Sequence, residues 1–94
     1  MLQISVGTND EIILSGRFDS AEAEKARKVF MSLDDGKVVD FGKLDYISSA
    51  GLGVLLAAQK KLSEQGKSLR LINVNGHIRD VFHFSGFDQI FEIV

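Results

Sequence analysis

The sequence contains no cysteine, and neither positive nor negative charge is in strong excess. Without cysteine the chain cannot form disulfides, a zinc–thiolate site or a thiol nucleophile, and it fits a reducing compartment, so we expect a cytoplasmic protein. The 11 Lys and Arg residues are nearly matched by 13 Asp and Glu, which gives a net charge of -2. With no basic run, the chain is not expected to bind nucleic acid, and a protein is the expected partner.

Long apolar stretches are also missing. No segment reaches the length needed to cross a bilayer, and the first residues lack the basic start and apolar core of a signal peptide, so we expect neither membrane insertion nor export. The 94 residues, 45% hydrophobic and 26% charged, predict one small domain over residues 1–94. Such a domain has little room for a deep substrate cavity.

Hydrophobic periodicity predicts alternating strands and helices. The expected elements are strands at 2–6 and 11–16, a helix starting at 19–22 and ended by Gly36, a short strand at 38–41 followed by a connection at 42–45, a helix after Ser48 and Ser49 closed by Gly66, a strand at 69–74, a helix around 78–82 ending near Gly86, and a strand at 90–93. In the second helix, Leu52, Leu55, Leu56 and Leu62 are expected to share the buried face, with Lys60, Lys61 and Glu64 pointing away.

This order, ββαβαβαβ, predicts an α/β fold with a mixed, mainly parallel sheet and helices packed on it. The two serines then lie at the junction between a strand and the helix that follows it. Ligands and partners usually engage open α/β sheets at this carboxyl edge, because helix N-termini project free N–H groups there.

The segment DYISSAGLGVL, residues 45–55, allows four interpretations of its serines: a helix cap, a nucleophile, a phosphate cradle and a site of phosphorylation. A cap contributes about 0.5–2 kcal/mol. It does not explain Gly51 and Gly53, each of which costs about 1 kcal/mol relative to alanine inside a helix. Close packing and a need for exposed backbone both remain open for these glycines.

Catalysis and cofactor binding find little support. A nucleophilic serine needs a base, but His77 and His83, the only histidines, fall in or beside the third helix, and the Gly-x-Ser-x-Gly elbow is absent. The pair Gly51 and Gly53 lacks the third glycine of a dinucleotide fingerprint, and no Gly-Lys-Ser/Thr follows. The adjacent Asp34 and Asp35 are most simply a solvated turn. We therefore predict no catalytic residue, no cofactor and no metal.

Residues 40–55, DFGKLDYISSAGLGVL, resemble the signature of STAS domains of the anti-sigma factor antagonist family. Upstream, LSGRFD at 14–19 resembles the family's second strand, and downstream, IRDVFHFSGF at 78–87 resembles its third helix. Together these segments cover nearly the whole chain. One position departs from the family pattern, which usually has aspartate where this chain has Ser48.

The resemblance implies a protein-binding switch and not an enzyme. In the family, the unphosphorylated antagonist binds a kinase-type anti-sigma factor, a serine kinase of the histidine-kinase-like ATPase type. It is released when that kinase phosphorylates a serine that matches Ser49. A serine phosphatase is a further candidate partner, and whether one resets the switch stays open. The expected docking surface consists of Asp19, Ser20, Ser48, Gly51 and Leu52. Some free-standing STAS proteins are instead constitutive regulatory subunits of membrane transporter complexes, and in that alternative the serines only cap a helix.

Elementary electrostatics agrees with a switch at this position. A phosphoserine adds about -1.5 to -2 charge, which the N–H groups of Ala50, Gly51 and Leu52 are expected to satisfy at a helix N-terminus. The fold should tolerate the phosphate, whereas a partner covering it should not.

Several of the neighbouring roles stay open. Asp19 is either part of the docking surface or a helix cap, Asp45 either adds repulsion to the phosphate or is a turn residue, and Leu52 either anchors a partner or packs in the core. A third possibility is a sensor that binds a small anion at the helix N-terminus.

Overall fold

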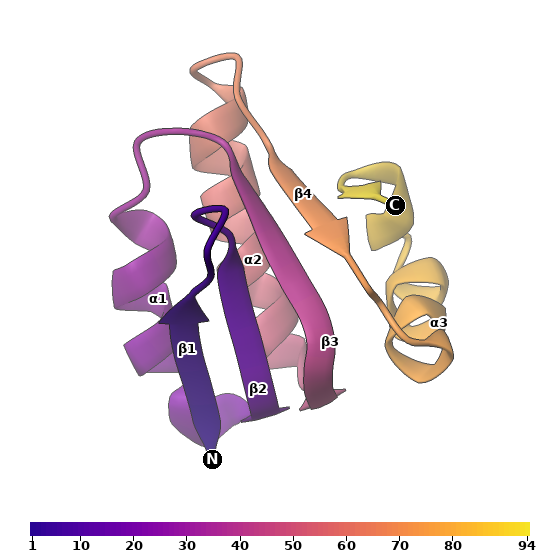
Figure 1. Cartoon of the computed structure of the whole chain (residues 1–94). Helices are drawn as coiled ribbons and strands as arrows, with labels where there is room; N and C mark the ends of the chain where they lie inside the picture. Colours follow the sequence, from indigo (N-terminus) through magenta and orange to yellow (C-terminus); the bar gives the residue numbers. More distant parts are fainter.

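The computed structural model describes all residues, 1–94, as a five-stranded sheet with helices on one face (Figure 1). In chain order the elements are β1 (Leu2–Val6), β2 (Ile12–Phe18), the 3-10 turn η1 (Ser20–Glu22), α1 (Ala23–Met31), β3 (Lys37–Ile47), α2 (Ser49–Ser63), β4 (Leu69–Ile72), α3 (Gly76–Ser85), the 3-10 turn η2 (Phe87–Gln89) and β5 (Glu92–Ile93). The predicted order ββαβαβαβ and the α/β class are confirmed.

The strands lie in the sheet in the order in which they occur along the chain, β1-β2-β3-β4-β5. β1 is antiparallel to β2, and the other neighbours are parallel. Parallel strands added in one direction by right-handed crossovers place every connecting helix on the same face. Figure 1 shows α1 and α2 behind the sheet and no element in front of it. The sheet therefore has one covered face and one open face.

The core lies between the covered face and the helices. Its largest fully buried side chains are Phe18, Phe30, Phe41, Phe82, Leu2, Leu14, Leu44, Leu55, Leu62, Leu69, Leu71 and Ile78. Phe82 of α3 makes edge-on contacts with Phe41 of β3, at 6.0 Å between ring centroids, and with Phe91, at 5.6 Å. Such pairs contribute about 0.5–1.5 kcal/mol beyond area burial and fix α3 over the far half of the sheet.

The expected connection at 42–45 is wrong, because these residues continue β3 as an 11-residue strand. Its register against β2 shifts twice, once opposite Ile13 to Ser15 and once opposite Gly16 to Arg17, so β3 carries two extra residues. The buried positions are consequently Val39, Phe41, Leu44 and Ile47. Each bulge shifts the alternation of buried and exposed residues by one position, so the whole strand does not show the period of two on which a strand prediction relies.

The first helix also differs from expectation. Asp19 precedes η1 without any side-chain cap bond, and α1 itself begins only at Ala23. It ends at Met31, so Gly36 does not close it. Position 36 requires glycine for another reason, because a Cβ there would lie 2.8 Å from the carbonyl oxygen of Ser68.

Details of α2, α3 and β5 refine the prediction. Lys61 does not point away; its Nζ donates to the carbonyl oxygens of Met31 and Leu33 at the end of α1. Leu56 is only half-buried. Gly66 takes the expected left-handed conformation, with φ of 74°, and Gly86, near which α3 was expected to end, has the same conformation, with φ of 79°. The last strand is confined to Glu92 and Ile93, because η2 precedes it.

Candidate functional site

The backbone brings the ends of β2 and β3 together at one edge of the sheet. Ile47 pairs with Phe18, and the N–H of Ser48 donates to the carbonyl oxygen of Phe18 at 2.9 Å. The residues that follow each strand, Asp19 and Ser20 on one side and Ser48 and Ser49 on the other, therefore lie at the same edge. We call these four residues the serine edge. In Figure 1 it lies at the lower end of β2 and β3.

The two serines have different roles in the helix start. Ser48 is the N-cap of α2: its backbone is extended, with φ -89° and ψ 171°, and its side chain accepts a hydrogen bond from the N–H of Gly51 at 3.1 Å. Ser49 is the first helical residue, is exposed, and its hydroxyl has no partner in the chain. One serine is thus used by the fold and the other is free.

The free N–H groups of α2 are not the ones expected from the sequence. The N–H of Gly51 is taken by the Ser48 side chain, and that of Leu52 by the Ser48 carbonyl oxygen at 2.9 Å. Of the three residues named for phosphate binding, only Ala50 keeps a free N–H, and Ser49 supplies a second one. An anion on Ser49 therefore meets two open donors at the positive end of a 15-residue helix.

The two glycines of α2 are explained differently. A Cβ on Gly51 would lie 3.0 Å from the side chains of Ile47 and Phe18, so Gly51 allows α2 to pack closely against β2 and β3. Gly53 is exposed, and a Cβ there would meet nothing within 4 Å. It lies one helical turn beyond Ser49, on the same face of α2. No contact within the chain accounts for this glycine.

Asp19 contains the only buried side-chain oxygen or nitrogen atom in the structure that lacks a partner, its Oδ1. The side chain is partly exposed, makes no cap bond, and follows β2 directly beside Ser48. Burying an acceptor without a donor costs about 1–3 kcal/mol. The sequence predicted Asp19 at this edge but not its unsatisfied oxygen.

The remaining predicted residues are placed as follows. Ser20 is exposed in η1, which lies against α2. Leu52 is 7% exposed and belongs to the core, so it does not extend outward. Asp45 is not in a turn: it occupies the second bulge of β3 and is exposed.

A second helix N-terminus lies at the carboxyl edge of the sheet and was not singled out from the sequence. Asn75 caps α3 by accepting from the N–H of Ile78 at 2.9 Å, and its Nδ2 donates to the carbonyl oxygen of Leu44 in β3 at 3.3 Å. The dipeptide Asn75-Gly76 was the available signal, because asparagine is a preferred N-cap.

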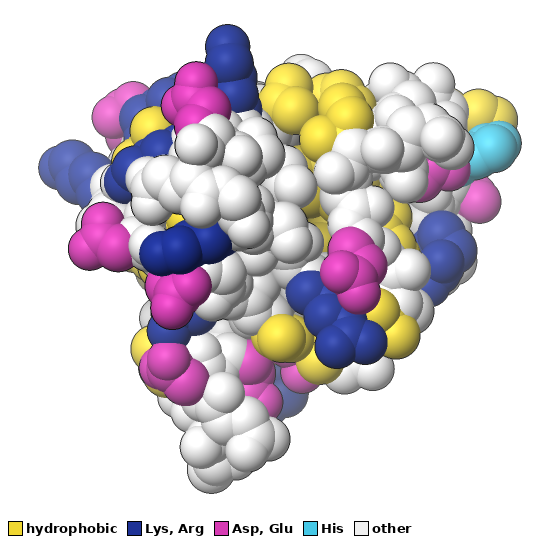
Figure 2. Space-filling model, turned by 90° about the horizontal axis from the view of Figure 1, so that it is seen from above, with side chains coloured by type: hydrophobic (Ala, Val, Ile, Leu, Met, Phe, Trp, Pro, Cys, Tyr) yellow, Lys and Arg dark blue, Asp and Glu magenta, His cyan; other side chains and the backbone are white.

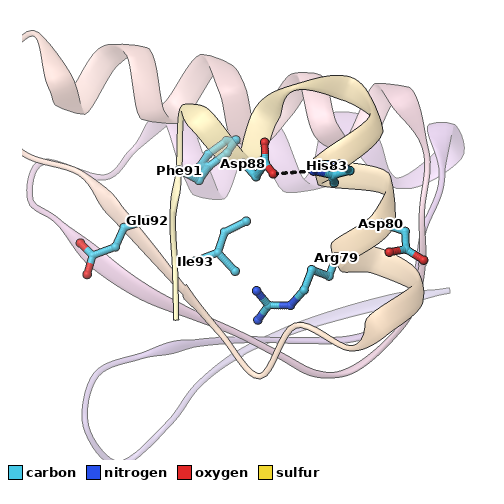
Figure 3. Close-up of a pocket in the computed structure, with 7 residues that line it drawn as sticks. All are labelled: Arg79, Asp80, His83, Asp88, Phe91, Glu92 and Ile93. Carbon is cyan, nitrogen blue, oxygen red and sulfur yellow. Dashed lines mark hydrogen bonds and ion pairs between the residues drawn. The ribbon is translucent and has the colours of Figure 1, made fainter.

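The largest hollow, of about 510 Å³, lies elsewhere, between α3, η2 and β5 (Figure 3). Its lining residues are Arg79, Asp80, His83, Asp88, Phe91, Glu92 and Ile93. His83 Nδ1 contacts Asp88 Oδ2 at 3.0 Å, and Glu92 pairs with Arg70 at 3.2 Å. Both signs of charge line the hollow, and within the lining only His83 and Asp88 pair with each other, so no single sign of charge is present to select a ligand.

Neither a metal centre nor a membrane-spanning helix is found in the molecule. No group of three or more histidine, cysteine or carboxylate side chains is arranged to hold a metal ion, and no helix has the length and apolar content to cross a membrane. The end of the molecule opposite the serine edge mixes basic and acidic side chains (Figure 2). That end of the molecule therefore carries no patch of a single sign of charge.

Comparison with known proteins points to one family. The family model described as "Mlab, STAS domain" matches residues 4–94. The chain belongs to the STAS domain family. This STAS domain is 42% identical over 84 residues to a protein of Bordetella bronchiseptica assigned as the anti-sigma factor antagonist BtrV, covering 85% of this chain and 72% of that protein. It is 28% identical over 87 residues to the anti-sigma-B factor antagonist of Listeria monocytogenes, covering 88% and 76%.

Solved structures share the fold of the STAS domain. The anti-sigma factor antagonist SpoIIAA in its unphosphorylated form matches with a TM-score of 0.70 and 20% identity, over 100% of this chain and 87% of that one. Its phosphorylated form from Bacillus matches with the same TM-score and 21% identity, over 100% and 91%. At this identity the likeness concerns the fold alone.

Proposed function

We propose that this STAS domain is an anti-sigma factor antagonist that binds a kinase-type anti-sigma factor through the serine edge and is released when Ser49 is phosphorylated. The proposal rests on the different roles of Ser48 and Ser49 at the start of α2. Because Ser48 caps α2, the exposed hydroxyl of Ser49 is free to accept a phosphoryl group without any loss to the fold.

Ser48 stands where the family usually has aspartate, and the capping geometry supports phosphorylation in spite of this. Aspartate and serine are both preferred N-cap residues, since each offers a side-chain oxygen to the N–H groups of the first turn. The exchange keeps the start of α2, and with it the position of Ser49. Recognition of the acceptor is then expected to depend on backbone shape more than on the charge of residue 48.

The phosphate acts on the complex and not on the fold. In the free domain the N–H groups of Ser49 and Ala50 and the positive end of α2 stabilise it. In the complex it would be covered, and burying a dianion without a partner costs several kcal/mol, where each 1.4 kcal/mol weakens affinity about tenfold. The carboxylate of Asp19 at the same edge adds repulsion.

Asp19 and Gly53 give independent support for partner binding at the serine edge. Asp19 keeps a carboxylate at this edge although its buried Oδ1 lacks a donor, a cost to the free domain that a role of the partly exposed side chain in partner binding would explain. Gly53 leaves a gap on the exposed surface of α2, where a partner's backbone can approach closely. Both features weaken the free domain and are explained by a bound state.

The test is phosphorylation of the purified chain by a kinase-type anti-sigma factor of the same genome with ATP, followed by intact mass and site mapping. We expect one phosphate on Ser49, none in Ser49→Ala, and retained phosphorylation in the matched control Ser48→Ala. Affinity for the kinase should fall at least a hundredfold for the phosphorylated form.

Two results would contradict the proposal. Firm binding without phosphate transfer would identify a constitutive docking module, as in STAS subunits of transporter complexes. Phosphate on Ser48, Ser20 or another residue would place the switch elsewhere. A phosphatase that removes the phosphate and restores binding would complete the cycle.

A further inference from the structure

The free edge of β1 presents backbone groups of which all but one pair with nothing in the chain. β1 lies at the end of the sheet and pairs with β2 in a regular register, from Leu2 opposite Gly16 to Val6 opposite Ile12, without a shift. In an antiparallel pair, alternate residues direct both N–H and C=O toward the neighbouring strand. The residues between them direct the same groups outward.

Three contacts fix which residues face outward. The N–H of Gly7 donates to the carbonyl oxygen of Glu11, and the N–H of Arg17 donates to that of Met1, so the odd-numbered residues of β1 face β2. The carbonyl oxygen of Leu2 instead accepts from Lys25 Nζ of α1, at 2.6 Å. Leu2, Ile4 and Val6 therefore carry the outward groups, and only the Leu2 carbonyl is occupied.

The edge strand β1 lacks most of the features that prevent edge strands from pairing with another chain. Its sequence, LQISV, has no charge, no proline and no bulge, and Val6 is 69% exposed. The opposite edge strand, β5, has two residues, one of them Glu92 in an ion pair with Arg70. Short and charged edges resist pairing, whereas regular uncharged edges favour it.

We propose that β1 pairs antiparallel with β1 of a second copy of this chain, so that one continuous sheet runs through both. A two-fold axis at Ile4 places Ile4 opposite Ile4 of the second copy and Leu2 opposite Val6. Each outward N–H then meets an outward C=O. Lys25 gives up the Leu2 carbonyl on pairing, so it opposes the contact.

A second copy fits this edge because the pattern is complementary to itself. The outward residues are spaced symmetrically about Ile4, and an uncharged strand brings no like charges together across the axis. Pairing also covers the exposed side chain of Val6. Since β2 and β3 run in opposite directions in the two copies, the two serine edges lie at opposite ends of the joined sheet, and each remains open to its own partner.

The first experiment uses cysteine cross-linking, for which the chain has a clean background because it contains no cysteine. The proposed register places Gln3 opposite Ser5 of the second copy, in a pair whose own backbone groups face β2 and whose side chains are therefore close. We expect a disulfide-linked dimer when Gln3→Cys and Ser5→Cys proteins are mixed, and at least tenfold less from either variant alone. Equal cross-linking in the mixture and in the single variants would overturn the register.

The second experiment measures association by sedimentation equilibrium of the full chain. Val6→Pro removes one outward N–H and no bond to β2, so it should weaken association about tenfold, while the matched control Val6→Thr keeps the N–H and should associate like the wild type. Lys25→Met frees the Leu2 carbonyl and should strengthen association. A monomer at millimolar concentration in both the wild type and Lys25→Met, or a dimer indifferent to Val6→Pro, would refute the proposal.

Discussion

Replacing Ser48 with alanine should destabilise the fold, whereas the same change at the neighbouring Ser49 should not. Ser48 accepts a hydrogen bond from the N–H of Gly51, a donor that α2 cannot satisfy internally. Ser49 Oγ makes no bond within the chain and is exposed. The comparison isolates capping, because both substitutions remove one hydroxyl from adjacent positions.

The expected magnitude follows from the geometry of the cap. Loss of a serine N-cap costs about 0.5–2 kcal/mol, and Gly51 is buried, so water cannot readily replace the lost acceptor. We expect about 1–2 kcal/mol for Ser48→Ala, and a change of 1 kcal/mol lowers Tm by about 4–8 °C in a domain of this size. Ser49→Ala should be neutral or stabilise by up to about 0.5 kcal/mol, since alanine favours the helix.

The assay is urea unfolding followed by far-UV circular dichroism, with Ser48→Asp as a third variant. Aspartate keeps the acceptor and adds a charge that the helix dipole favours by about 0.3–1 kcal/mol, so Ser48→Asp should equal or exceed the wild type. If Ser49→Ala lost as much stability as Ser48→Ala, the cap would not be Ser48, and the argument for a free acceptor hydroxyl would fail.

Three further predictions concern the same end of the molecule and the packing of α2. Gly51→Ala should destabilise by about 1–3 kcal/mol through overpacking, while Gly53→Ala should stabilise by about 0.5–1 kcal/mol and weaken binding of the kinase-type anti-sigma factor; equal effects on unfolding would contradict the packing difference. Asp19→Ala, which removes the unsatisfied oxygen, should raise the stability of the free domain by up to about 1 kcal/mol and reduce partner affinity in a titration; lower stability would mean that Asp19 is satisfied within the fold. Lys61→Met should cost about 1 kcal/mol, measured by urea unfolding, because the last carbonyl oxygens of α1 lose their donor; an unchanged midpoint would show that water replaces it.

The sequence predicted the fold class and the place of the serines for a physical reason. Apolar residues at period two and period 3.6 are visible along a single chain, and Ser-Ser before an apolar helix marks a helix start. The bulged half of β3 was missed because its buried residues, Phe41, Leu44 and Ile47, follow neither period. Tertiary pairing with β2 determines that spacing, and it leaves no local signal.

The candidate site was predicted in position but not in detail. Either serine could cap α2 on sequence grounds, and only the backbone at Ser48, extended with its N–H bonded to Phe18, decides between them. Gly51 and Gly53 look alike in the sequence, yet one packs against Phe18 and the other faces open space. The orphaned oxygen of Asp19 depends on η1 intervening before α1, which a capping pattern does not reveal.

The use of serine as the N-cap also sets the contrast between the two states of the proposed switch. A capping aspartate would leave a permanent negative charge one residue from the acceptor, so a partner would have to accommodate anionic background even before phosphorylation. With Ser48 the position beside the acceptor is uncharged, and phosphorylation of Ser49 adds about -1.5 to -2 to a helix start that carries no charge of its own. The discrimination between the two states should therefore be steeper at low ionic strength than in a relative with aspartate, and salt should erode it more.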